Sequence, residues 1–207
     1  MASQQSFPFG GEILPSDGSA ILYPEFLSND EADTFLQELA TANTWERQEL
    51  MMFGKLVIEP RLSSWHSSGQ TYTYSGRPRI AQPWSPTLQS LREKSETHTQ
   101  HSFNGVLLNL YRDGRDYMGW HSDDELVNGP EPLIASISLG AERRFDMRHR
   151  ETGETVSAML NHGSLLVMSG LSQKCWKHRI PKMPRSTDPR VNLTFRRLLP
   201  ECGPSKS

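Results

Sequence analysis

The chain has 207 residues, of which 35% are hydrophobic, and its formal net charge is −2 at pH 7. This length is enough to bury one substantial hydrophobic core without disulfides, and the small net charge excludes a uniformly basic nucleic-acid-binding coat. No apolar run approaches the roughly 20 residues that cross a bilayer. Residues 1–20 lack the basic start and the apolar stretch of a secretory signal, so we expect no membrane partner.

The cysteine content favours a reducing compartment. Cys175 and Cys202 are too few to form a disulfide framework. We expect the cytoplasm if the source is bacterial and the nucleus if it is eukaryotic. We also expect a monomer with one domain over residues 19–199, flanked by frayed ends over residues 1–18 and 200–207.

Two helices are predicted in the first half of the chain. Ser28 and Glu31 have the spacing of a capping box, and apolar residues then recur at helical spacing, which predicts a helix over about 29–42. Ser85-Pro86 joins a capping residue to the residue that is favoured at the first helical position, so a second helix is expected to begin there.

From Phe103 onward the pattern changes to short runs typical of β-strands, separated by turn signals such as Asp113-Gly114 and Thr152-Gly153. The predicted strands cover residues 106–111, 133–139, 143–148, 156–160, 164–168, 176–180 and 191–198. Many short strands at this spacing indicate a sandwich or barrel. The sequence therefore predicts a mainly β fold with N-terminal helices, an α+β arrangement.

The triplet His121-Ser122-Asp123 carries two side chains that can bind a metal. In an extended segment alternate side chains leave the same face, so His121 and Asp123 can reach one ion. His178, in a later predicted strand, would complete a set of two imidazoles and one carboxylate. Such a set leaves three adjacent metal positions open, and an iron(II) oxygenase uses these positions for a chelating co-substrate and dioxygen.

An isolated His-x-Asp triplet is weak support, because such triplets arise by chance and most histidines are solvated or hydrogen bonded in a core. Five further histidines compete for the ligand role: His66, His98, His101, His149 and His162. The strongest rival is His162, but it lies in a turn beside Gly163, where a side chain is more often solvated.

The last predicted strand has an alternating pattern. Its apolar face carries Val191, Leu193 and Phe195, and its polar face carries Arg190, Asn192, Thr194 and Arg196. Two arginines on a buried face cost free energy unless an anion pairs with them. A dicarboxylate such as 2-oxoglutarate meets that need, because a guanidinium group binds a carboxylate through two hydrogen bonds. A solvated basic face is the alternative.

Several ordered motifs resemble those of the AlkB-type dioxygenases, and specifically the branch typified by the vertebrate homologue that acts on double-stranded DNA. The resemblance covers residues 51–199. Its motifs are Asn109-Leu110-Tyr111, His121-Ser122-Asp123-Asp124-Glu125, the segment 134–140, the segment 162–166 and the segment 189–196. Together they are far more specific than any one of them.

The resemblance implies a double-stranded β-helix, or jelly roll, over residues 102–199, with helices and a nucleotide-recognition lid over residues 19–101. It implies Fe(II) bound by His121, Asp123 and His178, with 2-oxoglutarate and O2 as co-substrates. The residues expected at the 2-oxoglutarate site are Asn109, Tyr111, Arg190, Asn192, Thr194 and Arg196. We expect Arg190 to bind the distal carboxylate.

The resemblance also implies alkylated DNA as the partner, with the damaged base extruded from the helix and held by stacking and edge contacts. Tyr74 is expected to stack on the base, Tyr72 to make a polar contact within the segment Tyr72-Thr73-Tyr74, and Asp124 and Glu125 to lie beside the base. Without the resemblance, these tyrosines would be interpreted as half-buried strand residues. Trp120 departs from the family pattern and is expected to narrow the pocket.

The segment Met51-Met52-Phe53-Gly54-Lys55 places apolar bulk before a glycine and a cation. Phe53 is predicted to fill the gap that the extruded base leaves, because apolar wedges serve this purpose. The alternative is a core strand. Lys55, Arg61 and Arg77 are expected to hold phosphate groups.

The expected reaction is oxidative demethylation of 1-methyladenine and 3-methylcytosine, with release of formaldehyde, succinate and CO2. A second hypothesis keeps the iron chemistry but has RNA or a protein side chain as substrate. A third is a non-enzymatic module that binds modified nucleic acid, which would require an incomplete metal site or an incomplete arginine pair.

Overall fold

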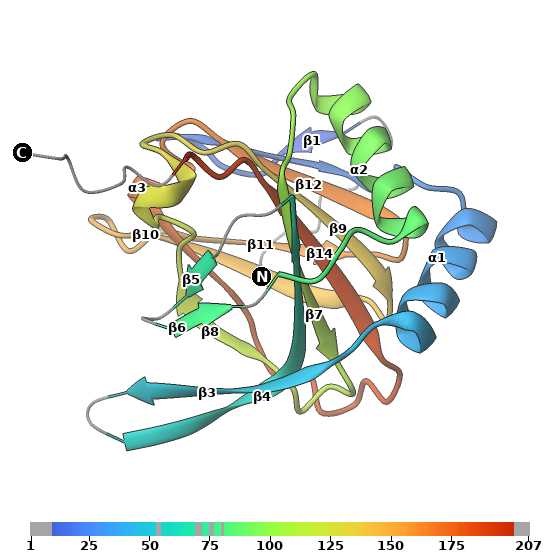
Figure 1. Ribbon diagram of the computed structural model, residues 1–207. Helices are drawn as coiled ribbons and strands as arrows, with labels where there is room; N and C mark the ends of the chain where they lie inside the picture. The colour runs from blue at the N-terminus through green and yellow to red at the C-terminus, as the bar shows by residue number, and fades with distance from the viewer. Residues whose placement is uncertain (1–9, 53–54, 69–71, 75–76, 80, 201–207) are drawn as a thin grey trace, which may run out of the picture.

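The computed structural model describes residues 10–52, 55–68, 72–74, 77–79 and 81–200. Figure 1 shows their arrangement in two facing β-sheets with two helices on the outside. In spatial order the larger sheet contains β1 (Gly11–Glu12), β2 (Ser19–Tyr23), β12 (Ser164–Ser169), β9 (Ile134–Gly140), β14 (Arg190–Arg196), β7 (Gly105–Tyr111), β4 (Lys55–Ser67) and β3 (Glu46–Met52).

The smaller sheet faces the larger one. It contains β11 (Thr155–Leu160), β10 (Arg143–His149), β13 (Trp176–Ile180) and β8 (Met118–His121). Side chains from both sheets form one buried cluster, with Ile134 and Leu166 from the larger sheet and Phe145, Met147 and Trp176 from the smaller. Burial of each such side chain stabilises the fold by roughly 1.5–3 kcal/mol. The predicted jelly-roll core is confirmed.

Helices α1 (Asn29–Ala42) and α2 (Pro86–Thr99) cover the outer face of the larger sheet (Figure 1). The predicted capping box is present, because the Ser28 hydroxyl accepts from the Glu31 amide while the Glu31 carboxylate accepts from the Ser28 amide. Both helices begin where the sequence predicts. Within the described ranges, no helix is both long enough and apolar enough to span a membrane.

Strand β14 lies in the centre of the larger sheet, antiparallel to both β7 and β9. All seven of its residues are buried. The alternation predicted from the sequence is confirmed: Val191, Leu193 and Phe195 pack in the cluster beneath the helices, while the polar side chains face the smaller sheet. The polar side chains are therefore held inside the sandwich.

The predicted strands all occur, with ends that differ by at most two residues. The N-terminal expectation needs correction, because β1 lies within the stretch expected to fray and pairs with β2. The Glu12 carboxylate also accepts a 2.7 Å hydrogen bond from the Ala20 amide, which fixes this segment on the edge of the sheet.

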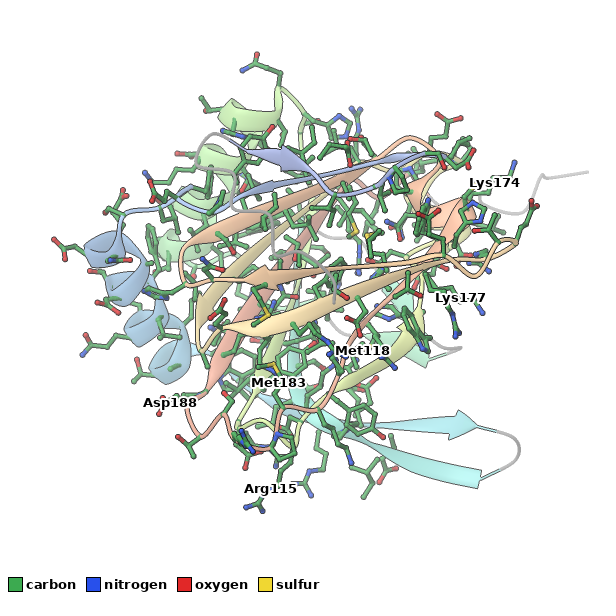
Figure 2. All side chains as sticks on the ribbon, turned by 180° about the vertical axis from the view of Figure 1, so that it is seen from behind. Arg115, Met118, Lys174, Lys177, Met183 and Asp188 are labelled. Atoms are coloured by element: carbon green, nitrogen blue, oxygen red, sulfur yellow. The ribbon has the colours of Figure 1, made fainter. Side chains whose placement is uncertain are left out.

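Two loops meet beyond one end of the sandwich, at residues 112–117 and 181–189. The Gly114 amide donates to the Ser186 carbonyl and the Met183 amide donates to the Gly114 carbonyl, each at 2.8 Å. Figure 2 shows the side chains of Arg115 and Met183 at this edge. The buried Arg143 joins the same loops by donating to the Asp116 and Pro181 carbonyls at 2.7 and 2.8 Å.

Candidate active site

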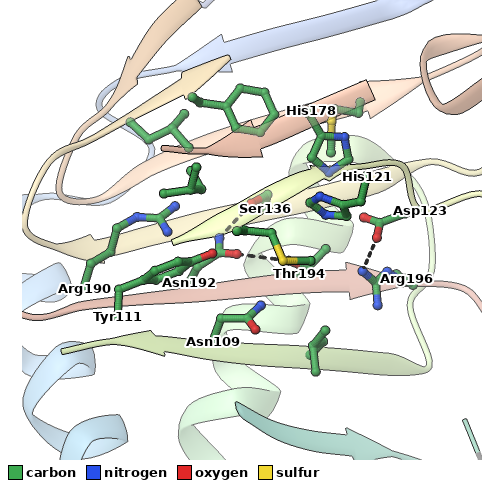
Figure 3. Close-up of a pocket in the computed structure, with 16 residues that line it drawn as sticks. Asn109, Tyr111, His121, Asp123, Ser136, His178, Arg190, Asn192, Thr194 and Arg196 are labelled. Atoms are coloured by element: carbon green, nitrogen blue, oxygen red, sulfur yellow. Dashed lines mark hydrogen bonds and ion pairs between the residues drawn. The ribbon is translucent and has the colours of Figure 1, made fainter. Parts of the chain in front are cut away.

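Two histidines and an aspartate meet at the edge of the smaller sheet. His121 ends β8, Asp123 lies in the loop that follows, and His178 lies in β13. The two histidines are paired directly across the antiparallel strands, so their side chains leave the same face. One candidate ligand atom from each of the three residues lies within 4.8 Å of the others (Figure 3). The structure thus brings the predicted metal ligands together.

His162, the strongest rival for the ligand role, contacts protein groups instead of the metal cluster. Its Nδ1 accepts a 2.8 Å hydrogen bond from the Gly140 amide, and its Nε2 is 3.3 Å from the carboxylate of Asp33. It therefore links a turn to helix α1. Within the described ranges, His121, Asp123 and His178 are the one group of three or more clustered side chains that could hold a metal ion.

Neighbouring groups orient the candidate ligands. Nδ1 of His121 lies 2.9 Å from the carbonyl oxygen of Gly119, so Nδ1 carries the proton and Nε2 is left with a free electron pair, as metal-binding histidines require. The Asp123 amide donates to Gln173 Oε1 at 2.9 Å, and its carbonyl accepts from Asn128 Nδ2 at 3.2 Å. Both ends of the aspartate backbone are therefore fixed by buried amide side chains.

The protonation states of the cluster suit a cation. Burial lowers the pKa of His121, and burial together with His121 lowers the pKa of His178 to about 3. Burial opposes ionisation of Asp123, but Arg196 and the two imidazoles lower the pKa of this carboxyl group to about 2. At neutral pH the site therefore offers two neutral imidazoles and one carboxylate, which are the forms that bind metals.

A buried pocket extends from this cluster between the two sheets (Figure 3). All six residues predicted at the 2-oxoglutarate site line it: Asn109, Tyr111, Arg190, Asn192, Thr194 and Arg196. Figure 3 shows Arg190 and Tyr111 at one end and the His-Asp-His cluster at the other. The opposite wall is apolar and includes Phe145, Leu160 and Ile180, so most of the polar groups lie on one side of the pocket.

Arg190 is 1% exposed and lies at the end of the pocket opposite the His-Asp-His cluster (Figure 3). Its Nη2 donates to the Ser138 hydroxyl at 2.9 Å, while Nε and Nη1 have no hydrogen-bond partner among the described residues. Burial lowers its pKa to about 10, so the group is still charged at neutral pH. A buried cation with two open donors fits a carboxylate.

Asn192 and Thr194, on the same polar face of β14 as Arg190, form hydrogen bonds with neighbouring protein groups. Asn192 Nδ2 donates to the Ser136 hydroxyl and the Ile137 carbonyl at 2.8 and 2.9 Å, and the Thr194 hydroxyl donates to Asn192. These bonds join β14 to β9 and fix the pocket wall. The sequence does not predict a role at the pocket for Ser136 and Ser138, although they occupy alternate positions on a predicted strand and therefore lie on one face.

The expectation that Arg61 holds a phosphate is wrong. Arg61 is 2% exposed, and its guanidinium donates to Asn109 at 2.9 Å and to Glu59 at 3.1 Å. The cause is strand alternation, because Glu59 and Arg61 lie on one face of β4 and Arg61 meets Asn109 from the neighbouring β7. Arg61 also contributes to the lowered pKa of His121, so it lies near the metal cluster.

The two predicted acidic neighbours of the base have different surroundings. Asp124 is exposed and forms a 2.9 Å ion pair with Arg150, which also donates to the Ser122 hydroxyl. Glu125 accepts a 2.8 Å hydrogen bond from Asn128. The structure thus distinguishes two residues that the sequence treats alike.

The remaining predicted substrate contacts are not placed in detail. Phe53 and Gly54 lie outside the described residues, and Lys55 begins β4. Tyr72, Thr73 and Tyr74 form β5, which pairs with β6 (Arg77–Arg79) in a small separate hairpin beside the sandwich (Figure 1). Their roles at the base stay predictions.

Comparison with known proteins defines the class. Residues 19–196 match the family described as the 2OG-Fe(II) oxygenase superfamily. The solved structure entitled "The structure of OsALKBH1" matches with a TM-score of 0.60 and 17% identity, over 86% of this chain and 97% of that one, which supports the fold. The superfamily uses Fe(II), 2-oxoglutarate and O2, and the donor set and the buried arginine described above fit them.

Two groups of relatives define the branch. Human "Alpha-ketoglutarate-dependent dioxygenase alkB homolog 3" is 42% identical over 190 residues, which cover 87% of this chain and 66% of that protein. Mouse "DNA oxidative demethylase ALKBH2" is 38% identical over 199 residues, which cover 90% and 83%. The chain belongs to the AlkB-type branch of the 2OG-Fe(II) oxygenases, and it spans just under two thirds of the length of the alkB homolog 3 proteins.

Proposed function

We propose that this enzyme oxidatively removes N-alkyl groups from DNA bases such as 1-methyladenine and 3-methylcytosine. The observation that carries the proposal is one buried pocket with the His-Asp-His cluster at one end and the open donors of Arg190 at the other. The relative named as a DNA oxidative demethylase supports the choice of DNA.

The chain's own residues bind and orient the reactants. His121, Asp123 and His178 would hold iron from one side, and Arg190 would bind the distal carboxylate of 2-oxoglutarate. When bound, the iron supplies activation of O2 coupled to oxidation of 2-oxoglutarate. The apolar wall formed by Phe145, Leu160 and Ile180 excludes water, so the oxidant reacts with the nearby alkyl group.

The proposed reaction balances without a further reductant. One oxygen atom of O2 enters succinate as 2-oxoglutarate loses CO2, and the other is inserted into a C–H bond of the N-methyl group. The resulting hemiaminal breaks its C–N bond, which releases formaldehyde and returns the unmodified base.

Access to the alkyl group requires an extruded nucleotide, because the pairing edge of a base is covered inside a duplex. The hairpin of β5 and β6 is the proposed lid over the extruded base, with Tyr74 stacked on it and Tyr72 in polar contact. We propose a monomer that acts on duplex or single-stranded DNA. RNA is the competing substrate to be tested.

The proposal is tested with protein loaded anaerobically with Fe(II). Oxygen, 2-oxoglutarate and an oligonucleotide with one 1-methyladenine are then added, and formaldehyde and succinate are measured. Coupled release that His121→Ala abolishes is the expected result. Succinate without formaldehyde would retain the oxygenase class and reject this substrate, and matched DNA duplex, DNA single strand and RNA would rank the nucleic acids.

A further inference from the structure

Arg143 is a buried cation that pairs with no carboxylate side chain within the described ranges. It is 1% exposed and lies on the same inward face of β10 as Phe145 of the pocket wall. Its guanidinium donates to the backbone carbonyls of Asp113, Asp116 and Pro181 at 3.3, 2.7 and 2.8 Å. A carbonyl oxygen satisfies a donor but has no full negative charge, so the positive charge of Arg143 is not cancelled by these bonds.

The acidic side chains of the adjoining loop have other arginines as partners. Both carboxylate oxygens of Asp116 accept from the Arg112 guanidinium, at 2.8 and 2.9 Å. The Asp113 carboxylate lies 3.9 Å from Nε of Arg115. The charges of residues 112–116 therefore sum to zero, and they leave the charge of Arg143 uncompensated.

Arg143 and Arg190 contact the same tyrosine ring. Cζ of Arg143 lies 5.3 Å from the centroid of the Tyr111 ring, and Cζ of Arg190 lies 5.2 Å from it. Both distances are in the range of a cation–π contact. Burial and the positive charge of Arg143 both lower the pKa of Arg190. Because two like charges near one ring cost free energy in a protein interior, an anion bound beside them is stabilised by both.

Arg143 reaches this end of the pocket indirectly. Of the residues that the structure describes, those lining the pocket include Tyr111 and Arg190 but not Arg143. The carbonyls that accept from Arg143 lie in the two loops next to the site. Residues 112–117 follow Tyr111 directly, and residues 181–189 lead directly into Arg190. Arg143 therefore holds the backbone beside both pocket residues and adds a charge without touching a bound carboxylate.

We propose that Arg143 is a positioning residue for the co-substrate, whose buried charge beside Tyr111 strengthens binding of the distal carboxylate of 2-oxoglutarate and sets a preference for keto diacids over keto monoacids. This inference rests on the proposed contact of that carboxylate with Arg190 and adds a second determinant to it. 2-Oxovalerate isolates the effect. It has a carbon chain of the same length and the same keto acid end, but a methyl group replaces the distal carboxylate.

The test measures binding without turnover. Protein is loaded with Mn(II), and isothermal titration calorimetry gives Kd for 2-oxoglutarate and, by competition, for 2-oxovalerate. Arg143→Gln removes the charge but keeps an amide that can donate to the loop carbonyls. Attraction to one unit charge across about 10 Å, at the effective dielectric constant of a protein, predicts that the preference for the diacid falls on the order of 10-fold. Kd for 2-oxovalerate and for Mn(II) should change little.

Arg143→Lys and Arg144→Gln make the result specific. Arg143→Lys loses the planar guanidinium, as Arg143→Gln does, but it keeps the charge and should retain most of the preference. Arg144 is the next residue on β10 and faces outward, where it is half exposed and pairs with Asp146. Arg144→Gln removes an equal charge that solvent already screens, so the preference should stay intact.

Each outcome decides the proposal. An unchanged preference in Arg143→Gln, an equal loss in Arg143→Lys, or an equal loss in Arg144→Gln would overturn the role of Arg143 alone. If Arg143→Gln does not fold, Arg143→Lys decides, because a retained preference supports the role of the charge and a lost preference overturns it.

Arg190→Met separates this inference from the proposal on which it rests. The variant should abolish the preference for the diacid if Arg190 binds the distal carboxylate. A preference that survives in Arg190→Met would overturn that carboxylate partner, and with it the role of Arg143. The test contains no DNA, so its result does not depend on the proposed substrate.

Discussion

Arg196 and Asp123 form a buried ion pair, with Nη2 of the arginine 2.7 Å from Oδ1 of the aspartate and each side chain at most 4% exposed. The arginine belongs to β14 of the larger sheet, whereas the aspartate follows β8 of the smaller one. The pair therefore joins the polar wall of the pocket directly to a candidate metal ligand.

We expect Arg196→Met to destabilise the metal-free protein by about 3–5 kcal/mol, because it leaves the Asp123 carboxylate buried without its guanidinium partner. The pKa of that carboxyl group should rise. Urea denaturation and the pH dependence of Mn(II) binding measure the two effects. The double variant Arg196→Met/Asp123→Asn should recover part of the stability, and no recovery would contradict the ion-pair explanation.

Arg190→Met should have the opposite effect on stability. The variant removes a buried cation with two unpartnered donors, so the protein without 2-oxoglutarate should become more stable, by about 1–4 kcal/mol. Kd for 2-oxoglutarate should rise at least about 100-fold, since a bidentate charged contact is lost. Calorimetry with 2-oxoglutarate and Mn(II) separates these effects, and tight 2-oxoglutarate binding in the variant would exclude Arg190 as the carboxylate partner.

The metal-free protein should lose stability as the pH falls below about 6.5. The unfolded chain protonates His178 near its ordinary pKa of 6.5, whereas the folded chain does so only near 3. The unfolded state therefore binds more protons between these values, and the free energy of unfolding falls by up to about 1.4 kcal/mol per pH unit for this residue. The pKa of Asp123 is lowered from 3.8 to about 2, so this residue reduces the free energy of unfolding only when the pH falls below about 3.8.

Urea denaturation at about pH 7 and about pH 5 tests this expectation. His178→Gln cannot titrate and should show a smaller difference between the two conditions. An equal difference in both proteins would place the pH dependence elsewhere.

Gly114→Ala should separate the two loops of residues 112–117 and 181–189. A Cβ at this position would lie 1.7 Å from the Met183 carbonyl oxygen, so the backbone must move. We expect a loss of about 2 kcal/mol or more, together with weaker 2-oxoglutarate binding, because the loop of residues 181–189 leads directly into Arg190. Gly153→Ala is the control variant for a steric clash, since nothing lies within 4 Å of its added Cβ. Its positive φ of 73° introduces backbone strain alone. Retained loop contact and affinity in Gly114→Ala would contradict the prediction.

The parts of the structure encoded by local pattern could be predicted from the sequence. Strand β14 has an alternation that assigns each side chain to a face, and capping residues set the starts of α1 and α2. Strand β8 was not predicted, because it has only four residues and contains Gly119, which leaves too short a run for alternation to be visible.

Contacts between distant segments set the limit of prediction at the site. The sequence suggests a phosphate contact for Arg61 because a basic residue suggests an anion, but its partner Asn109 is 48 residues away. Gln173 lies 50 residues from Asp123, and no local spacing links the two. Asn128 is closer in sequence and begins the predicted turn Asn128-Gly129-Pro130, but a turn signal does not fix the direction in which the Asn128 side chain points.

The two histidines of the candidate metal site and Arg190, the proposed carboxylate partner, belong to different sheets, each with its own network of backbone hydrogen bonds. Iron alone would contact only the smaller sheet and its following loop, and the distal carboxylate would contact only the larger one. A chelating keto acid bound to both would add a second connection beside the Arg196–Asp123 ion pair. Amide hydrogen exchange in β13 and in β14 should then slow together when metal and keto acid are both present. Metal alone would protect mainly β8 and β13.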